Sequence, residues 1–356
     1  MSGQVTTEPR PGTATTPSLH GERVLVTGGT GFLGVNLVRA FAERGAEVLA
    51  LVRSPADADA RRFLGDLGTR VKWILGDVTD RAGMASLVTE ERVGRIVHAA
   101  AVTATPAQER HAPARVFDVN AGGTLNLLEA ARQADVERFV LVSSGGLYGA
   151  GPPEPPVGED APVRTDSMYA IAKAASEQLV LRYRTIAGLD AVIGRLGTTY
   201  GPMERTTGSR TNLSAIQQAV VSMRASARDR RTVVVRGADV ARDFLHVDDA
   251  ADAFTRLVGT TGLGHDVYNV GAPIAAPLSV ALDALAARTG TAWAPADDET
   301  EQPDIVQGPA NARPAMDMGR ARDDLGWRFR YDLASGAVAT LDAFASGSDG
   351  PEGAGS

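Results

Sequence analysis

The sequence has no cysteine and only five histidines among its 356 residues. The missing thiols exclude disulfide bonds, thiolate metal sites and cysteine nucleophiles, and we expect no metal site. No apolar run approaches the length of about 20 residues that spans a bilayer, so we expect no membrane partner. The formal net charge of −7 argues against a nucleic-acid partner. The N-terminal region also lacks the apolar stretch of a secretory signal, and we therefore expect a soluble cytoplasmic protein.

Short apolar runs alternate with segments of helical periodicity over the first half of the chain. Six runs predict buried parallel strands, at Val24–Val26, Val48–Val52, Val71–Leu75, Ile96–His98, Phe139–Val142 and Ala191–Ile193. The segments between them predict helices at Phe32–Arg44, Ala82–Glu91, Ala114–Gln133 and Ser167–Ala187. This alternation is typical of a doubly wound sheet with helices on both faces. A ligand crevice is then expected at the carboxyl ends of the strands.

The predicted fold is therefore α/β, a Rossmann-type doubly wound parallel sheet with a smaller α/β C-terminal lobe. The lobe is expected because 356 residues exceed what one core usually carries and because the βα rhythm breaks after residue 193. Residues 1–20 and 347–356 are predicted to be disordered tails. The Rossmann domain is assigned to 21–193 plus about 232–262, and the substrate-binding lobe to about 194–231 and 263–346.

A glycine-rich turn follows the first predicted strand. Residues 23–34 read RVLVTGGTGFLG, in which a strand runs into a turn and the turn into a helix. Glycines at 28, 31 and 34 allow a sharp turn and a close approach of the backbone to a ligand, and the helix N-terminus favours negative charge. The pattern predicts a site for the pyrophosphate of a dinucleotide, with an ordinary tight βα turn as the alternative.

Two later features carry side chains capable of acid–base chemistry. Tyr169 and Lys173 are four residues apart in a helical segment and so share one helix face. An ammonium beside a phenol lowers the phenol's pKa from its usual value of about 10, which prepares a general acid or base. The alternative is an ordinary amphipathic helix. Ser143 and Ser144 end the strand Phe139–Val142, where a hydroxyl could bind a substrate oxygen or merely stabilise a turn.

Taken together, these features resemble the extended branch of the short-chain dehydrogenase/reductase family, the relatives that include sugar epimerases and dehydratases. The resemblance covers about Gly21 to Trp327. It is carried by nine segments: Thr27–Gly34, Gly76–Asp80, His98–Ala101, Asn120–Thr124, Ser143–Gly149, Tyr169–Lys173, Arg195–Pro202, Arg242–Asp249 and Leu325–Trp327.

The resemblance implies a role for each matching position. Tyr169 is the expected acid/base, Lys173 binds the nicotinamide ribose, and Ser144 orients the reacting oxygen. The expected cofactor-binding residues are Gly28, Thr30, Gly31, Phe32, Leu33, Gly34, Arg53, Asp77, Val78, Ala99, Ala100, Ala101, Asn120, Ser143, Tyr169 and Lys173. The expected substrate contacts are Ser144, Thr198, Arg242 and Arg313. A strand-end turn for Asp77 and a satisfied polar group for Asn120 remain alternatives, and His98 and His246 are expected to be structural.

The second predicted strand bears on the choice of cofactor. Relatives that use NAD usually carry an Asp at its end, where this chain has Val52 followed by Arg53. An arginine can pair with a 2′-phosphate, so the sequence favours NADP over NAD. The alternative is that Arg53 is solvated or stacks on the adenine, which either cofactor allows.

Departures from the family pattern narrow the reaction. Gly145 and Gly146 stand where dehydratases of the family carry an Asp-Glu pair, so dehydration is not expected. Epimerase-reductases of the family that invert two carbons use a Cys and a His, and the absence of cysteine disfavours that mechanism. Arg242 matches the arginine that contacts a nucleotide diphosphate, whereas Gln307 replaces the second one, and Arg313 is a candidate substitute. Thr198, three residues after Arg195, stands where members of the family often carry an Asn.

We therefore expect an NAD(P)-dependent enzyme that moves a hydride at a secondary alcohol or ketone of a sugar. The expected substrate is a nucleotide sugar, and the expected enzyme type is a 4-ketoreductase or a 4-epimerase. Two alternatives stay open: an NADPH-dependent reductase of a non-nucleotide carbonyl, favoured by Gln307 and Thr198, and a non-catalytic NAD(P)-binding scaffold. By analogy with the fold, a homodimer through the helices containing Tyr169 and Ala114–Gln133 is expected.

Overall fold

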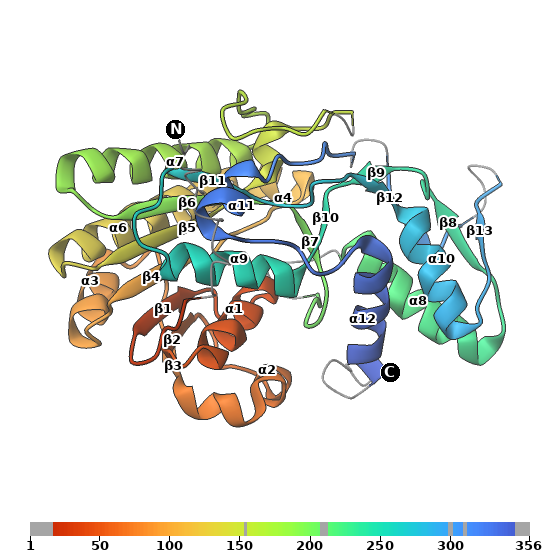
Figure 1. The fold of residues 1–356 in the computed structure, drawn as a ribbon, viewed down its shortest axis with the longest axis horizontal. Coiled ribbons are helices and arrows are strands. Elements are labelled where there is room, and N and C mark those ends of the chain that lie inside the picture. Colours follow the sequence, from red (N-terminus) through yellow and green to blue (C-terminus); the bar gives the residue numbers. More distant parts are fainter. Residues whose placement is uncertain (1–16, 153–154, 207–212, 298–301, 309–311, 346–356) are drawn as a thin grey trace, which may run out of the picture.

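The computed structural model describes residues 17–152, 155–206, 213–297, 302–308 and 312–345 (Figure 1). Most of the two predicted tails, 1–16 and 347–356, lies outside the described residues. The predicted N-terminal tail is too long by its last four residues. Leu19 is only 1% exposed and packs into the main core, because it covers apolar surface beside the first strand.

A seven-stranded parallel sheet forms the larger body, with strand order β11-β6-β5-β4-β1-β2-β3. Its strands are β1 (Arg23–Thr27), β2 (Glu47–Val52), β3 (Val71–Leu75), β4 (Arg95–His98), β5 (Arg138–Ser144), β6 (Ala191–Leu196) and β11 (Val267–Val270). All six predicted strands are confirmed. The seventh corrects the predicted domain boundary, because residues 267–270 pair with β6 in this sheet and not in the lobe.

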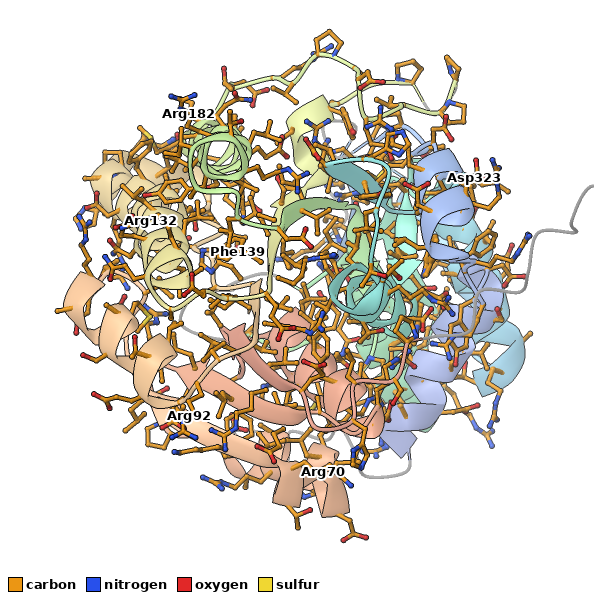
Figure 2. All side chains as sticks on the ribbon, turned by 60° about the vertical axis from the view of Figure 1, so that its left-hand side comes forward. Arg70, Arg92, Arg132, Phe139, Arg182 and Asp323 are labelled. Carbon is orange, nitrogen blue, oxygen red and sulfur yellow. The ribbon has the colours of Figure 1, made fainter. Side chains whose placement is uncertain are left out.

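Helices cover both faces of the sheet, as the alternating pattern predicted. One face packs against α1 (Phe32–Glu43) and α9 (Val247–Gly259), and the other against α3 (Arg81–Glu90), α6 (Gly123–Gln133) and α7 (Met168–Ala187). Figure 2 shows Phe139, which is fully buried, between these layers, while Arg132 and Arg182 lie at the surface. The sheet thus presents only its strand ends to a ligand.

The predicted helix Ala114–Gln133 is interrupted. It consists of α5 (Pro113–Phe117), a π-helical turn (Asp118–Gly122) and α6. Three short helices complete this body: α2 (Ala58–Leu64), α4 (Pro106–His111) and α11 (Gly319–Leu325), together with the 3-10 segments Gly65–Arg70 and Gly145–Tyr148.

The smaller lobe has its own sheet and its own core. In the sheet, β8 (Val233–Arg236) lies between β13 (Trp293–Pro295) and β14 (Ile305–Val306). Helices α8 (Ala215–Asp229), α10 (Leu278–Thr289) and α12 (Leu333–Ala345) pack around that core, at the right of Figure 1. Residues 233–236 therefore belong to the lobe, which corrects their predicted place in the Rossmann domain. The sheet that a strand joins depends on strands far away in the sequence, so the periodicity of the strand itself does not predict it.

Two short strand pairs connect the lobe to the larger body: β7 (Thr198–Tyr200) with β10 (Phe244–His246), and β9 (Ala241–Arg242) with β12 (Ala276–Pro277). Over the described part of the chain, no helix combines the length and apolar character needed to cross a bilayer. In the same residues, no group of three or more His, Asp or Glu side chains could hold a metal ion.

Candidate functional site

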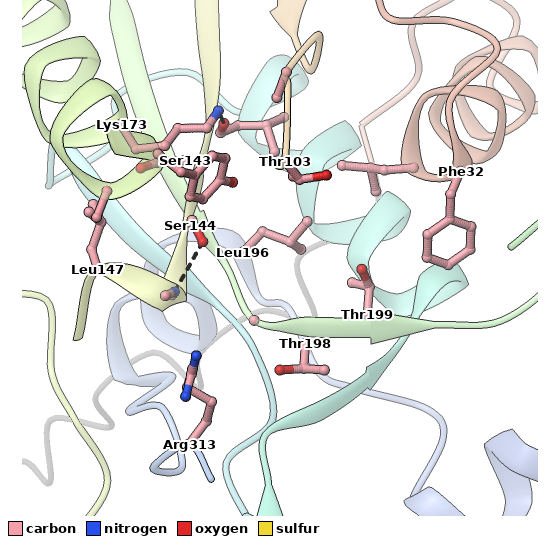
Figure 3. A pocket seen from close by; sticks show the side chains of 18 of the residues that line it. Phe32, Thr103, Ser143, Ser144, Leu147, Lys173, Leu196, Thr198, Thr199 and Arg313 are labelled. Atoms are coloured by element: carbon pink, nitrogen blue, oxygen red, sulfur yellow. Dashed lines mark hydrogen bonds between the residues drawn. The ribbon is translucent and has the colours of Figure 1, made fainter. Parts of the chain in front are cut away.

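Two adjoining cavities open at the carboxyl ends of the central strands. The larger has a volume of about 750 Å³ and extends to the lobe, and the smaller has a volume of about 370 Å³. Gly28, Gly31, Ala99 and Ala101 line both cavities, so the glycine turn stands where the two meet. Figure 3 shows the larger cavity. One extended ligand could therefore occupy both.

The glycine turn has the geometry that a pyrophosphate requires. Gly28 has a φ of +72°, a conformation that favours glycine. A Cβ on Gly34 would lie 2.0 Å from the carbonyl oxygen of Gly28, so only glycine fits there. Helix α1 begins after Gly31 without a side-chain cap or an acidic first turn, so no side chain of its own competes with an anion there. These residues fit the diphosphate of a dinucleotide.

The smaller cavity, called the adenosine cavity below, contains residues that the family resemblance places beside the adenosine of the cofactor. Val52, Arg53, Asp77 and Val78 line it, as the resemblance implied. The Asp77 carboxylate accepts hydrogen bonds from the N–H and the hydroxyl of Thr79, at 2.9 and 2.8 Å. The backbone hydrogen bond is the main reason that the pKa of Asp77 lies below its usual value. Asp77 thus stabilises its own turn and also faces the cavity.

A buried hydroxyl fixes the loop that lines both cavities. Thr27 Oγ1 accepts the backbone N–H groups of Ala99 and Ala100, at 3.1 and 3.0 Å. It also contacts Nδ1 of His98 at 2.8 Å. Burial, reinforced by the nearby Lys173 charge, lowers the pKa of His98 to about 3, so this imidazole is neutral. His98 is a structural histidine, as predicted.

Tyr169, Lys173 and Ser144 meet in the larger cavity. Tyr169 is the second residue of α7, whose N-terminus is capped by the hydroxyl of Ser167. Burial raises the pKa of Tyr169, and a side-chain hydrogen bond with Ser144 acts in the opposite direction. The expectation that Lys173 lowers this pKa is not met in this state, because Lys173 instead donates to the carbonyl of Val142 at 2.7 Å. Burial lowers the pKa of Lys173 to about 8, while Glu177 raises it.

Glu177 connects α7 to β5, the strand that ends in Ser143 and Ser144. Its carboxylate accepts the Ser143 hydroxyl at 2.6 Å and forms a two-point ion pair with Arg195, at 3.0 and 2.8 Å. All three side chains are buried. Ser143 lines the cavity, and its hydroxyl proton is donated to Glu177. Ser144, the next residue, is the one whose hydroxyl meets Tyr169.

The opposite wall of the larger cavity is cationic. Arg242 donates to the Thr198 hydroxyl at 3.1 Å, and that hydroxyl donates to buried Asp243 at 2.7 Å. Nε of Arg242 is buried without a hydrogen-bond partner among the described residues. Burial, opposed by Asp243 and reinforced by Arg313, lowers the pKa of Arg242 to about 10. Figure 3 shows Arg313 and Thr198 on the side away from Lys173. Two neighbouring guanidiniums suit an anion.

Every predicted site residue except Asn120 lines one of the two cavities. The Asn120 side chain is buried and exchanges two hydrogen bonds with the backbone of Val102, at 2.8 and 3.1 Å. It holds the cavity loop from behind, so its assignment as a cofactor contact is corrected to the alternative, a satisfied polar group. Gln307 is also buried, and its amide donates to the carbonyl of Val240.

Sequence reasoning missed two charged residues of this region. Arg205 lines the larger cavity and is held by Asp57 and Asp59, at 2.8 and 3.3 Å, which ties the segment after β7 to the start of α2. No local pattern marks that contact. Glu177 could have been found, since it follows Tyr169 and Lys173 on the same helix face at further intervals of four residues.

The fold and the site define a dinucleotide-binding enzyme of the short-chain dehydrogenase/reductase type, with Tyr, Lys and Ser beside the strand ends. Residues 24–271 match the profile described as the NAD dependent epimerase/dehydratase family. Because this match spans most of the chain, the protein belongs to that family, in the extended branch of the short-chain enzymes.

Individual relatives agree with this placement. The chain is 31% identical over 324 residues to the UDP-glucose 4-epimerase of Mycolicibacterium smegmatis, covering 90% of this chain and 98% of the relative. It is 29% identical over 331 residues to the dTDP-glucose 4,6-dehydratase of Streptomyces niveus, covering 90% and 92%. Among solved structures, the UDP-glucose 4-epimerase of Thermus thermophilus in complex with NAD superposes with a TM-score of 0.73 at 29% identity, covering 91% and 99%.

Proposed function

We propose that this protein is an NAD(P)-dependent enzyme that transfers a hydride at a secondary alcohol or ketone of a nucleotide sugar, as a 4-epimerase or a 4-ketoreductase. The observation that carries the proposal is the placement of Tyr169 and Ser144 in one cavity with Arg242, next to a second cavity that shares the glycine turn. Relatives named as 4-epimerases support the same reaction class.

The reacting oxygen would be held by the chain's own hydroxyls. Ser144 donates to the substrate oxygen, and Tyr169 exchanges a proton with it, as a base during oxidation and as an acid during reduction. Lys173, whose ammonium nitrogen lies 6.0 Å from the centre of the Tyr169 ring, would bind the nicotinamide ribose. A bound nicotinamide supplies the hydride acceptor and donor, while these residues supply position and charge.

The cationic wall would hold the diphosphate of the nucleotide. Arg242 has a buried unpartnered Nε, and Arg313 lies close enough to lower its pKa, so a bound anion would relieve an existing electrostatic cost. Dehydration is not favoured, because Gly145 and Gly146 offer no acid or base beside Ser144. Among the described residues that line the larger cavity, the carboxylates are Asp166 and Asp243, and Asp243 accepts the hydroxyl of Thr198.

A second candidate is reduction of a carbonyl compound without a nucleotide. It is favoured by Gln307, which faces Val240 inside the lobe and adds no charge to the cationic wall. The two candidates differ in one requirement. A nucleotide sugar needs Arg242 for binding, whereas a neutral carbonyl compound does not.

The cofactor is proposed to be NADP in preference to NAD. Support comes from Arg53, which lines the adenosine cavity, and from Val52, which leaves no carboxylate at the strand end. The UDP-glucose 4-epimerase of Thermus thermophilus was solved in complex with NAD, so an NADP preference would distinguish this chain from that relative.

A homodimer is proposed through the outer faces of α5, α6 and α7. An apolar hollow there is lined by Phe117, Leu125 and Leu179, of which Phe117 is 40% and Leu125 37% exposed. Leu125→Asp should convert the dimer to a monomer in multi-angle light scattering, and a parent that is already monomeric would exclude it. The cytoplasmic location stays a prediction of the sequence.

The proposed reaction is tested with a panel of UDP-, dTDP- and CDP-linked hexoses, each incubated with either cofactor and analysed by mass spectrometry and NMR. Tyr169→Phe should lower kcat by about 10²- to 10⁴-fold, the usual contribution of a positioned acid or base. Tyr183→Phe is the matched control, since Tyr183 lies on the same helix and its hydroxyl donates to Glu129 away from the cavity. Equal activity of Tyr169→Phe and the parent would refute the assignment.

A further inference from the structure

A methionine side chain lies across the ends of three neighbouring strands. Strands β11, β6 and β5 are adjacent in the main sheet, and each is followed directly by a glycine, at Gly271, Gly197 and Gly145. Met316 packs against all three glycines and is only 1% exposed. Gly145 and Gly197 also line the larger cavity, so Met316 lies directly behind the cavity wall.

Space, and not backbone conformation, accounts for these glycines. None of the three has a positive φ. A Cβ on Gly271 would lie 2.2 Å from Sδ of Met316, and a Cβ on Gly145 would lie 3.2 Å from both Sδ and Cε. A Cβ on Gly197 would lie 3.3 Å from the same Sδ and 2.5 Å from Oδ2 of Asp243. The unbranched thioether therefore fills the space that the missing side chains leave.

The backbone around Met316 is held by two other segments. Its N–H donates to the carbonyl of Ala272, just after β11, at 3.0 Å. The residues on either side bond to Val157: its N–H donates to the carbonyl of Ala315 at 2.8 Å, and its carbonyl accepts the N–H of Asp317 at 2.9 Å. The place of the thioether is therefore fixed by the end of β11 and by the loop that contains Val157.

The Ser144 hydroxyl belongs to the turn that rests on Met316. Ser144 caps the 3-10 turn Gly145–Tyr148, and its Oγ accepts the N–H of Gly146 at 3.0 Å (Figure 3). The same hydroxyl forms the hydrogen bond with Tyr169. The first residue of the turn has no side chain to anchor it, so its backbone position depends on what packs against it, and Met316 does so.

We propose that Met316 is a positioning residue for the hydride transfer, because its packing against Gly145 sets where the Ser144 hydroxyl meets Tyr169. The inference rests on the proposed function and deepens it. A displacement of about 1 Å at a reacting group can cost about 10²-fold in rate. Met316→Ala should therefore lower kcat on a nucleotide hexose that the parent converts by about 10- to 100-fold. Met316→Leu nearly conserves the volume and should recover most of that loss.

A spectroscopic signal that needs no substrate tests the same role. In protein labelled with carbon-13 at the tyrosine ζ-carbons, the chemical shift of Tyr169 reports the hydrogen bond to its oxygen, and Tyr169→Phe assigns the signal. It should move in Met316→Ala and also in Gly271→Ala, whose added methyl displaces the thioether. The double variant should match Met316→Ala alone, because the clash needs the thioether. The Tyr183 signal should stay in place in every variant and reports an intact fold, since its hydroxyl donates to Glu129.

Met223→Ala is the matched control, because it removes an equally buried methionine from the core of the lobe. It should lower the unfolding temperature without moving the Tyr169 signal or kcat. An unmoved Tyr169 signal in Met316→Ala would overturn the proposal, and so would an equal change in Met223→Ala. If Met316→Ala does not fold, Gly271→Ala carries the same test. Absence of turnover with every nucleotide hexose would instead refute the proposed function, and the Tyr169 signal would still decide the role of Met316.

Discussion

The ammonium nitrogen of Lys173 lies 6.0 Å from the centre of the Tyr169 ring and is held by the carbonyl of Val142. The immediate hydrogen-bond partner of the phenol is Ser144. In the proposed acid/base, the phenol therefore has a serine as its direct partner, and the lysine reaches it only at a distance. This separation of roles has consequences for the pH dependence of both activity and stability.

Glu177→Gln should shift the alkaline limit of activity. The negative charge of Glu177 raises the pKa of Lys173, against the burial that lowers it to about 8. Without that charge Lys173 loses its proton at a lower pH, so the alkaline limb of the profile of kcat against pH should move to a lower pH than in the parent. A purely structural role for Glu177 would lower kcat equally at every pH. Glu129→Gln, at an exposed ion pair with Arg132, is a control.

Lys173→Met should change how stability depends on pH. The pKa of Lys173 is about 8 in the folded protein against 10.5 ordinarily. Between these two values the unfolded chain therefore binds more protons than the folded protein. The buried Lys173 charge lowers the free energy of unfolding by its full amount below pH 8, and this destabilisation is relieved as the pH rises. The free energy of unfolding of the parent, relative to that of the variant, should thus increase between about pH 8 and 10. Urea denaturation at several pH values measures this, and parallel curves would contradict the buried charge.

Arg242→Ala should weaken nucleotide-sugar binding more than catalysis. The loss of a charged contact to a diphosphate predicts a KM increase of about 10- to 100-fold, with a smaller change in kcat. Arg228→Ala, at an exposed residue of α8 outside the cavity, is the control. Calorimetry with UDP alone separates binding from turnover. An unchanged KM would favour the non-nucleotide carbonyl substrate.

Gly34→Ala should abolish dinucleotide binding. Its Cβ would lie 2.0 Å from the carbonyl oxygen of Gly28, so the turn must move away from the geometry that admits a pyrophosphate. We expect a loss of stability of about 1–3 kcal/mol, as for other overpacked sites. Gly68→Ala is the control, since a Cβ there meets nothing within 4 Å. Retention of parental NADP affinity by Gly34→Ala would show that the turn does not hold the cofactor.

The features that could be predicted from the sequence are those determined by neighbouring residues. The six strands, the glycine turn and the four-residue spacing of Tyr169 and Lys173 are local patterns, and the structure confirms them. The predictions that failed depend on distant contacts. Strand β11 joins the main sheet through β6, and β8 joins the lobe through β13 and β14, which no periodicity along the chain reveals.

The same distinction applies within the site. The sequence motifs predicted that Tyr169 and Ser144 lie in the site. The pKa of Tyr169 is raised because the side chain is buried, and burial depends on tertiary packing. Likewise Asn120 was recognised as a site residue from its motif, whereas its partner Val102 was not foreseeable. Motifs identify the participants, and tertiary packing decides which atoms remain free to react.

The most direct test follows the hydride itself. Nucleotide hexoses deuterated at C4 are mixed with the enzyme and oxidised cofactor, quenched within one turnover, and the nicotinamide is analysed by mass spectrometry. We expect deuterium in the reduced nicotinamide with the parent enzyme and with Tyr183→Phe, and none with Tyr169→Phe. Product formed with its deuterium released to water, or a panel in which no nucleotide hexose transfers deuterium, would contradict it.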